Sequence, residues 1–140
     1  VSDSNPDNII CYRGAQIVMD GNKLSPYNTW PEFTSNSASM LLFPTGKDGV
    51  LYPPGVFSKE VFNEEVFKKL TPFNDDVWFK AMSLLNRTSC KKIALVHRDY
   101  QVIKGSGQVE LQTDNVRGKK NDEYLQRVFD KYELFDLLNG

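Results

Sequence analysis

Residues 43–86 constrain the fold more than any other part of the chain. The stretch opens with a turn that contains Gly46 and Gly49, and a short apolar strand at residues 50–52 follows, ended by two prolines. After a polar connector, two adjacent aspartates begin a helix with an apolar stripe. Glycines allow close approach of the backbone to a ligand. The stretch therefore predicts a site between the turn and the helix.

The other segments predict one α/β domain over residues 1–140, with α+β as the alternative: a small mixed sheet flanked by helices. Residues 1–8 are polar and are expected to form a flexible lead-in. Asp20-Gly21-Asn22 is a hairpin-type turn. We expect two short strands within residues 9–19, further strands at 40–43, 50–52, 93–96 and 99–103, and helices at 58–70 (divided near Asn63), 75–86 and 121–138.

A long loop at residues 25–39 is rich in proline, serine, threonine and asparagine. Long loops inside compact domains are often binding segments, so Tyr27 and Trp30 are candidates for stacking on a sugar ring. In the alternative interpretation, which we favour slightly, the two rings only attach the loop to the core.

Composition excludes several classes of function. A length of 140 residues fits one domain, and a net charge of -1 lacks the basic excess of a nucleic-acid-binding protein. No apolar run approaches the roughly 20 residues of a membrane span, and the polar start is unlike a signal peptide. We therefore expect a cytoplasmic protein, and the abrupt start suggests a fragment. Cys11 and Cys90 lack Cys-x-x-Cys spacing and are expected to be free thiols.

Several motifs together resemble a known family. Gly-Val-Leu-Tyr-Pro-Pro at residues 49–54, followed by Asp-Asp-Val-Trp-Phe at 75–79, is similar to the carboxy-terminal half of bacterial glycosyltransferases of the GT-A type. These enzymes transfer sugars from nucleotide-sugar donors. Further motifs in the same order extend the resemblance over most of the chain: Cys-Tyr-Arg at 11–13, Ser-Pro-Tyr-Asn-Thr-Trp at 25–30, Phe-Pro-Thr-Gly at 43–46 and Lys-Asn-Asp-Glu at 120–123.

The resemblance implies a catalytic base at the start of a helix beside the acceptor pocket. By position Asp76 is the first candidate and Asp75 the second. A neighbouring like charge raises the pKa of a carboxyl group and the helix N-terminus lowers it, so the sequence leaves the net direction open. Aspartates at a helix start also serve as caps without any chemistry.

The resemblance also implies binding residues. The acceptor would lie against Gly46, Gly49, Tyr52, Trp78 and Trp30, and Arg13 would lie near the donor diphosphate. The alternatives are an ordinary tight turn, core aromatic residues and a surface ion pair of Arg13. Lys47 and Asp48 stand where family members more often carry a glycine and an apolar residue.

Members of this family hold a divalent cation, Mn or Mg, against the donor diphosphate with an Asp-x-Asp motif. The chain has no such motif in the matching context, so by itself we expect it to bind nucleotide sugars poorly. The lone histidine, His97, is a candidate metal ligand, although a structural role is the more frequent one for such a residue.

The sequence therefore predicts the acceptor-binding and catalytic-base half of a glycosyltransferase. In the complete enzyme a hexosyl unit would pass from a nucleotide diphosphate sugar to a saccharide acceptor, in bacterial surface polysaccharide synthesis. The alternative is a non-catalytic carbohydrate-binding or interaction module with the same fold, and whether the isolated chain is an enzyme stays open. A hydrolase that uses Asp75 and Asp76 is disfavoured, because adjacent helical residues diverge whereas glycosidase carboxylates flank the scissile bond.

Overall fold

The strands form three small sheets. The computed structural model describes residues 6–93, 103 and 119–139. In the three-stranded mixed sheet the central strand β1 pairs antiparallel with β6 and parallel with β7. The second sheet pairs β2 with β5, and the third is the hairpin β3–β4. The bounds are β1 (Ile9–Cys11), β2 (Gly14–Gln16), β3 (Met19–Asp20), β4 (Lys23–Leu24), β5 (Leu42–Pro44), β6 (Val50–Leu51) and β7 (Cys90–Lys92).

Helices supply most of the remaining regular structure. Three are short 3-10 helices, η1 (Tyr27–Thr29), η2 (Gly46–Asp48) and η3 (Lys59–Phe62). The α-helices are α1 (Glu64–Leu70), α2 (Asp75–Leu85), α3 (Lys120–Lys131) and α4 (Leu134–Asn139).

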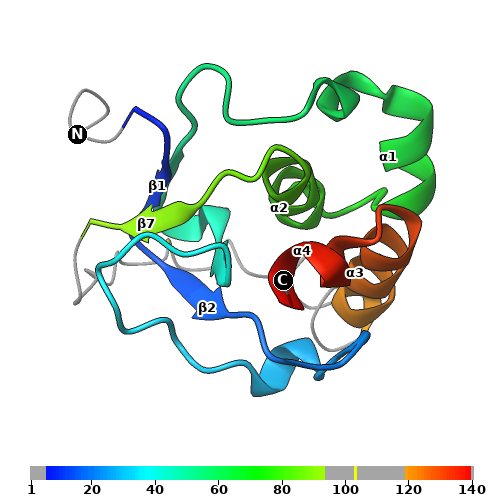
Figure 1. Ribbon diagram of the computed structural model, residues 1–140, viewed down its shortest axis with the longest axis horizontal. Coiled ribbons are helices and arrows are strands. Elements are labelled where there is room, and N and C mark those ends of the chain that lie inside the picture. Colours follow the sequence, from blue (N-terminus) through cyan, green and yellow to red (C-terminus); the bar gives the residue numbers. More distant parts are fainter. Residues whose placement is uncertain (1–5, 94–102, 104–118, 140) are drawn as a thin grey trace.

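Helix α2 lies at the centre of the fold. In Figure 1 the strands β1, β2 and β7 lie to one side of it and α1 and α3 to the other. It packs against α3, α4, η3 and β5. Its buried side chains, Val77, Trp78, Ala81, Met82 and Leu84, join the largest apolar cluster of the described residues. Because α2 is covered on several sides, the position of its first turn is fixed by the core.

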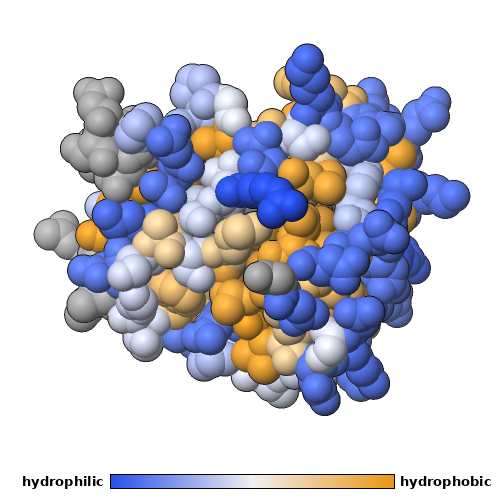
Figure 2. All heavy atoms as spheres, in the orientation of Figure 1, coloured by the Kyte–Doolittle hydropathy of each residue, from blue (hydrophilic) through white to orange (hydrophobic). Residues whose placement is uncertain are grey.

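Hydrophilic side chains cover much of the face seen in Figure 2, and hydrophobic atoms reach the surface in a band near the middle of the view. Individual aromatic side chains are also exposed, among them Phe62 at 86% and Phe73 at 58%.

The mixed α/β class predicted from the sequence is confirmed, with small sheets beside the helices. The hairpin turn is confirmed as well, since Gly21 joins β3 to β4 with a φ of 56°. The expected break near Asn63 separates η3 from α1. The helix expected from residue 75 is α2, and the side chain of Asn74 caps it.

Some expected boundaries are wrong. The helix expected over residues 121–138 is two helices, because Glu133 has a φ of 53° and the chain turns between α3 and α4. Strand β5 begins two residues later than expected and includes Pro44, which pairs at the end of a two-stranded ladder where no amide donor is needed. No strand was expected at β7. Three predictions fall mainly outside the described residues: the strands at 93–96 and 99–103, of which only residues 93 and 103 are described, and the lead-in 1–8.

Candidate functional site

The first turn of α2 meets the glycine turn predicted from the sequence. The side chain of Asn74 caps the helix by accepting a hydrogen bond from the Val77 amide at 3.1 Å. One residue into the helix, Asp76 Oδ2 accepts a hydrogen bond from the Gly46 amide at 3.1 Å. A Cβ atom at position 46 would lie 3.1 Å from Asp76 Oδ1, so the close approach depends on glycine. The structure therefore brings Asp76 and Gly46 together, as the sequence predicted.

The carboxyl group of Asp76 is held in a partly buried position, whereas Asp75 is exposed. Burial raises the pKa of Asp76 above its ordinary value, and the neighbouring Asp75 raises it further. The hydrogen bond from the Gly46 amide lowers that pKa but does not cancel the effect of burial. The main cause of the raised pKa is therefore burial, which the sequence alone did not indicate.

The charge of Asp76 helps to raise the pKa of two tyrosines. Burial and the Asp76 carboxylate raise the pKa of Tyr27 to about 12. Burial and both aspartates raise the pKa of Tyr52 as well. Both phenols therefore keep their protons at neutral pH and remain hydrogen-bond donors.

Two residues at the start of α3 accept hydrogen bonds from the cap of α2 and from the segment that carries Tyr27. Asn121 Oδ1 accepts a hydrogen bond from Asn74 Nδ2 at 2.5 Å. The next residue, Asp122, accepts one from the Tyr27 amide at 2.6 Å. These two bonds fix both the cap of α2 and the segment that carries Tyr27.

Beside Asp76 lies a small pocket with no room for a ligand, and a buried lysine lines it. Lys80, one helical turn after Asp76, is 2% exposed, and its Nζ lies 3.7 Å from Cys90 Sγ. Burial lowers the pKa of Lys80 and raises that of Cys90. The polar and aromatic side chains in the wall are Tyr52, Asp76, Phe79, Lys80, Ser83 and Cys90.

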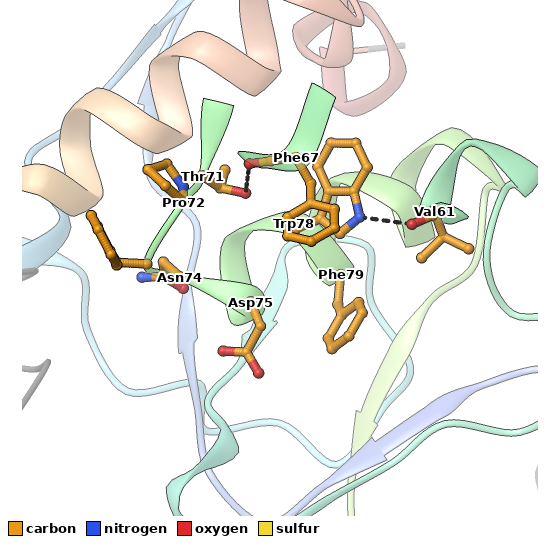
Figure 3. A pocket seen from close by; sticks show the side chains of 9 residues that line it. Val61, Phe67, Thr71, Pro72, Asn74, Asp75, Trp78 and Phe79 are labelled. Carbon is orange, nitrogen blue, oxygen red and sulfur yellow. Dashed lines mark hydrogen bonds between the residues drawn. The ribbon is translucent and has the colours of Figure 1, made fainter. Parts of the chain in front are cut away.

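A larger pocket of about 480 Å³ opens beside Asp75. It lies between α1, the turn at residues 71–74 and α2 (Figure 3). Its walls include four aromatic rings, and Asn74 and Asp75 contribute polar atoms. The rings belong to Phe67, Phe73, Trp78 and Phe79.

The remaining predicted binding residues are dispersed. Trp30 is buried in the core and its Nε1 donates to the Ser25 carbonyl, which supports loop attachment over sugar stacking. Trp78 is also largely buried, although it lines the large pocket. Gly49, at φ 98°, serves the turn after η2, and a Cβ atom at this position would have no heavy atom of another residue within 4 Å. Tyr52 packs on Phe79 with ring centroids 5.4 Å apart.

Arg13 forms an ion pair with Asp48, with its Nε 2.7 Å from the carboxylate. The Asp48 side chain is only 2% exposed. This pair supports the ion-pair alternative for Arg13, and it explains how a charged residue is accommodated at position 48 of the glycine turn.

The described residues do not form the cation site that the resemblance implies. No three His, Cys, Asp or Glu side chains gather as metal ligands in residues 6–93, 103 and 119–139, and His97 lies outside these ranges. Mg and Mn take about six oxygen ligands, whereas Asp75 and Asp76 face different pockets. Among the described helices none combines the length and apolar character needed to cross a membrane.

The chain matches no protein-family model, and no curated protein or solved structure is significantly similar to it.

Some residues of the site were missed by the sequence reasoning. Asn121 and Asp122 stand in the Lys-Asn-Asp-Glu motif, but their tertiary hydrogen bonds have no local signal. Lys80 had a local signal, since it places a charge on the mostly apolar side of α2 that the core buries.

Proposed function

We propose that this chain is the acceptor-binding and catalytic-base part of a glycosyltransferase, with Asp76 as the base. One observation carries the proposal: Asp76 is partly buried beside the glycine turn, in an environment that raises the pKa of its carboxyl group. A general base works best when its pKa approaches the operating pH. The motif resemblance supports the reaction class.

In the proposed reaction the acceptor is a saccharide with a hydroxyl group facing Asp76. The hydroxyl oxygen attacks the anomeric carbon of a hexosyl donor, and its proton passes to the Asp76 carboxylate. The bond between the anomeric carbon and the diphosphate oxygen breaks, and a nucleotide diphosphate leaves. Tyr52 lines the small pocket together with Asp76, and its phenol is protonated at neutral pH.

The donor side belongs to the proposal by resemblance only. A nucleotide diphosphate sugar, with Mn or Mg in the complete enzyme, would be the donor, and cytoplasmic synthesis of a bacterial surface polysaccharide would be the setting. No step above is assigned to a metal ion.

Saccharide binding tests the first half of the proposal. The chain is titrated with methyl glycosides of glucose, galactose, mannose and N-acetylglucosamine and followed by amide NMR. We expect saturable shifts at Gly46 and Asp76 for at least one sugar. If no sugar in the panel moves either amide at millimolar concentration, the acceptor site is wrongly assigned.

Transfer tests the second half. The chain is incubated with the bound saccharide, a panel of nucleotide diphosphate hexoses and Mn or Mg, and the released nucleotide diphosphate is measured. Asp76→Asn should lower the rate by about 10²- to 10⁴-fold, the usual contribution of a general base. Asp75→Asn is the matched control, since the exposed neighbour should matter far less. An unchanged rate in Asp76→Asn would contradict the base assignment.

The second candidate is a carbohydrate-binding module without catalysis. The aromatic pocket beside Asp75 favours it, because such a pocket can bind a ligand whether or not Asp76 acts as a base. Equal saccharide affinity in the wild type and Asp76→Asn, with amide shifts at the pocket residues Asn74 and Asp75 and none at Gly46, would support this candidate.

A further inference from the structure

The pocket beside Asp75 has the size of a small-molecule site but few polar groups for a ligand. Its volume of about 480 Å³ lies within the range of roughly 300–1,000 Å³ that is usual for such sites. Four aromatic side chains contribute to its walls, and Figure 3 shows the rings of Phe67, Trp78 and Phe79 near one another. The ring centroids of Phe67 and Trp78 are 6.0 Å apart.

Most polar atoms of this pocket already have partners within the chain. The Trp78 indole N–H donates to the Val61 carbonyl at 3.1 Å, and the Thr71 hydroxyl donates to the Phe67 carbonyl at 3.3 Å (Figure 3). The Asn74 side chain caps α2 and donates to Asn121. Asp75 is different, because its exposed carboxylate accepts only one amide hydrogen bond, from Asp76 at 3.1 Å, among those that the structure shows.

This distribution of polar groups disfavours a sugar ring inside the pocket. A pyranose carries several hydroxyl groups, and each loses its hydrogen bonds to water when it is buried. The pocket offers them one carboxylate at its edge. An apolar group would fill the same space without leaving polar atoms unpaired.

The pocket adjoins the proposed catalytic site. Phe79 lines both this pocket and the smaller one that contains Asp76. Asp75 and Asp76 are adjacent at the start of α2 and belong to the two different pockets. The smaller pocket has no room for a ligand. A ligand with two parts could therefore place its apolar part against the rings of the larger pocket and its polar part at the surface beside the two carboxylates, since Asp75 is exposed and Asp76 is only partly buried.

We propose that the pocket binds the apolar aglycone of the glycosyl acceptor, an aryl or alkyl group linked to the sugar whose hydroxyl faces Asp76. This inference rests on the proposed function. The sugar lies at the two aspartates, with a hydroxyl donating to Asp75, and the aglycone packs on Phe73, Trp78 and Phe79. The acceptor is thus a hydrophobic glycoside rather than a free sugar.

The two tryptophans of the chain allow a direct test. The Trp78 indole N–H resonance reports on the pocket, and that of Trp30, which does not line it, is an internal reference. Methyl and phenyl glycosides of the same four hexoses are compared by titration in ¹H–¹⁵N spectra. We expect the phenyl glycoside to bind at least about tenfold more tightly and to shift the Trp78 indole, since burial of its ring removes apolar area from water.

Two exposed phenylalanines provide matched variants that should both fold. Phe73 is 58% exposed and lines the pocket, and Phe62 is 86% exposed and does not. Phe73→Ala should lower the affinity for the phenyl glycoside by at least about threefold and leave the affinity for the methyl glycoside unchanged, because only the phenyl glycoside buries a ring there. Phe62→Ala should change neither affinity.

The outcomes separate this inference from the proposed function. Phenyl and methyl glycosides that bind equally, moving Gly46 without the Trp78 indole, would overturn the aglycone pocket and leave the acceptor site intact. Phenyl glycosides that bind no more tightly than free phenol and shift the Trp78 indole with Gly46 unmoved would overturn the inference, since the ring contact would then be adventitious. The inference is supported if the phenyl glycoside shifts both the Gly46 amide and the Trp78 indole, and if its binding is weakened in Phe73→Ala but not in Phe62→Ala.

Discussion

The side chain of Asn121 accepts a hydrogen bond from Asn74 Nδ2 at 2.5 Å and so joins the start of α3 to the cap of α2. Asn121 is 5% exposed, so this bond forms in a largely dry environment. The following residue, Asp122, accepts from the Tyr27 amide at 2.6 Å. Two consecutive residues therefore hold the helix that carries Asp76 and the loop that carries Tyr27. The proposed base is positioned by a segment far from it in sequence.

Removal of the Asn121 side chain should destabilise the fold. Asn121→Ala leaves Asn74 Nδ2 without its acceptor in a largely buried place, and such an unpaired group costs about 1–3 kcal/mol. The free energy of unfolding is measured by urea denaturation. Asn36→Ala, at an exposed loop position, is the control and should change it by less than about 0.5 kcal/mol. Equal values for both variants would show that the Asn74–Asn121 bond contributes nothing.

Substitution of the two glycines in the turn should have different effects for different reasons. Gly49→Ala places a side chain at φ 98°, a conformation that non-glycine residues rarely adopt, and strain of this kind costs about 1–3 kcal/mol. Gly46→Ala meets no such strain, but its Cβ lies 3.1 Å from Asp76 Oδ1. The carboxylate must shift by a few tenths of an ångström, which should weaken its hydrogen bond with the Gly46 amide and raise the pKa of Asp76 further.

Carboxyl-detected NMR titration of Asp76 distinguishes the two glycine variants. Gly46→Ala should shift the Asp76 titration upward, whereas Gly49→Ala should lower stability and leave that titration in place. A Gly46→Ala protein with the wild-type titration of Asp76 would mean that the hydrogen bond from the amide does not influence the carboxyl group.

Local sequence patterns predicted the parts of the site that lie within one element. The cap at Asn74, the start of α2 and the glycine turn each have a short signature, and all are present. The contact between Asp76 and Gly46 was also expected, because the motif order placed the turn and the helix in one site.

Long-range relationships could not be predicted in the same way. Attachment of the loop to the core by Tyr27 and Trp30 was the favoured interpretation, but the sequence did not identify Phe43 as the ring against which both pack, with centroids 5.7 and 5.8 Å away. Strand β7 includes two lysines, which conceal its strand character, and Lys92 is buried because its Nζ bonds to Glu32 and to the Phe33 carbonyl. Such partners are separated by about 60 residues, beyond any local period.

Lys80 should be a source of instability at neutral pH. Burial lowers its pKa from the ordinary 10.5, so the folded chain binds the proton less readily than the unfolded chain. Below pH 10.5 the preference of the unfolded chain for the proton lowers the free energy of unfolding. This loss of stability becomes smaller as the pH rises toward 10.5. Lys80→Met, of similar length, should be more stable than the wild type. Its advantage should be constant below the folded pKa of Lys80 and should decrease as the pH rises from there to 10.5. An advantage that grows as the pH rises toward 10.5 would contradict a lowered pKa.

The raised pKa of Asp76 gives the opposite dependence on pH. Below the ordinary value of 3.8 the carboxyl group is protonated in both states and carries no penalty. As the pH rises through the window between 3.8 and the raised folded pKa, the unfolded chain releases its proton first, so the free energy of unfolding falls. Asp76→Asn does not titrate and can still accept from the Gly46 amide. Its stability relative to the wild type should therefore increase with pH across this window and then level off.

Urea denaturation of both proteins over a pH series measures the difference, and other titrating groups cancel in it. Asn36→Ala, which removes no titrating group, should differ from the wild type by the same amount at every pH. If the stability of Asp76→Asn relative to the wild type falls as the pH rises, the carboxylate is stabilised rather than destabilised by the fold. Asp76 would then be a helix-start anion held by the Gly46 amide and the macrodipole, and a general base would have to be sought elsewhere.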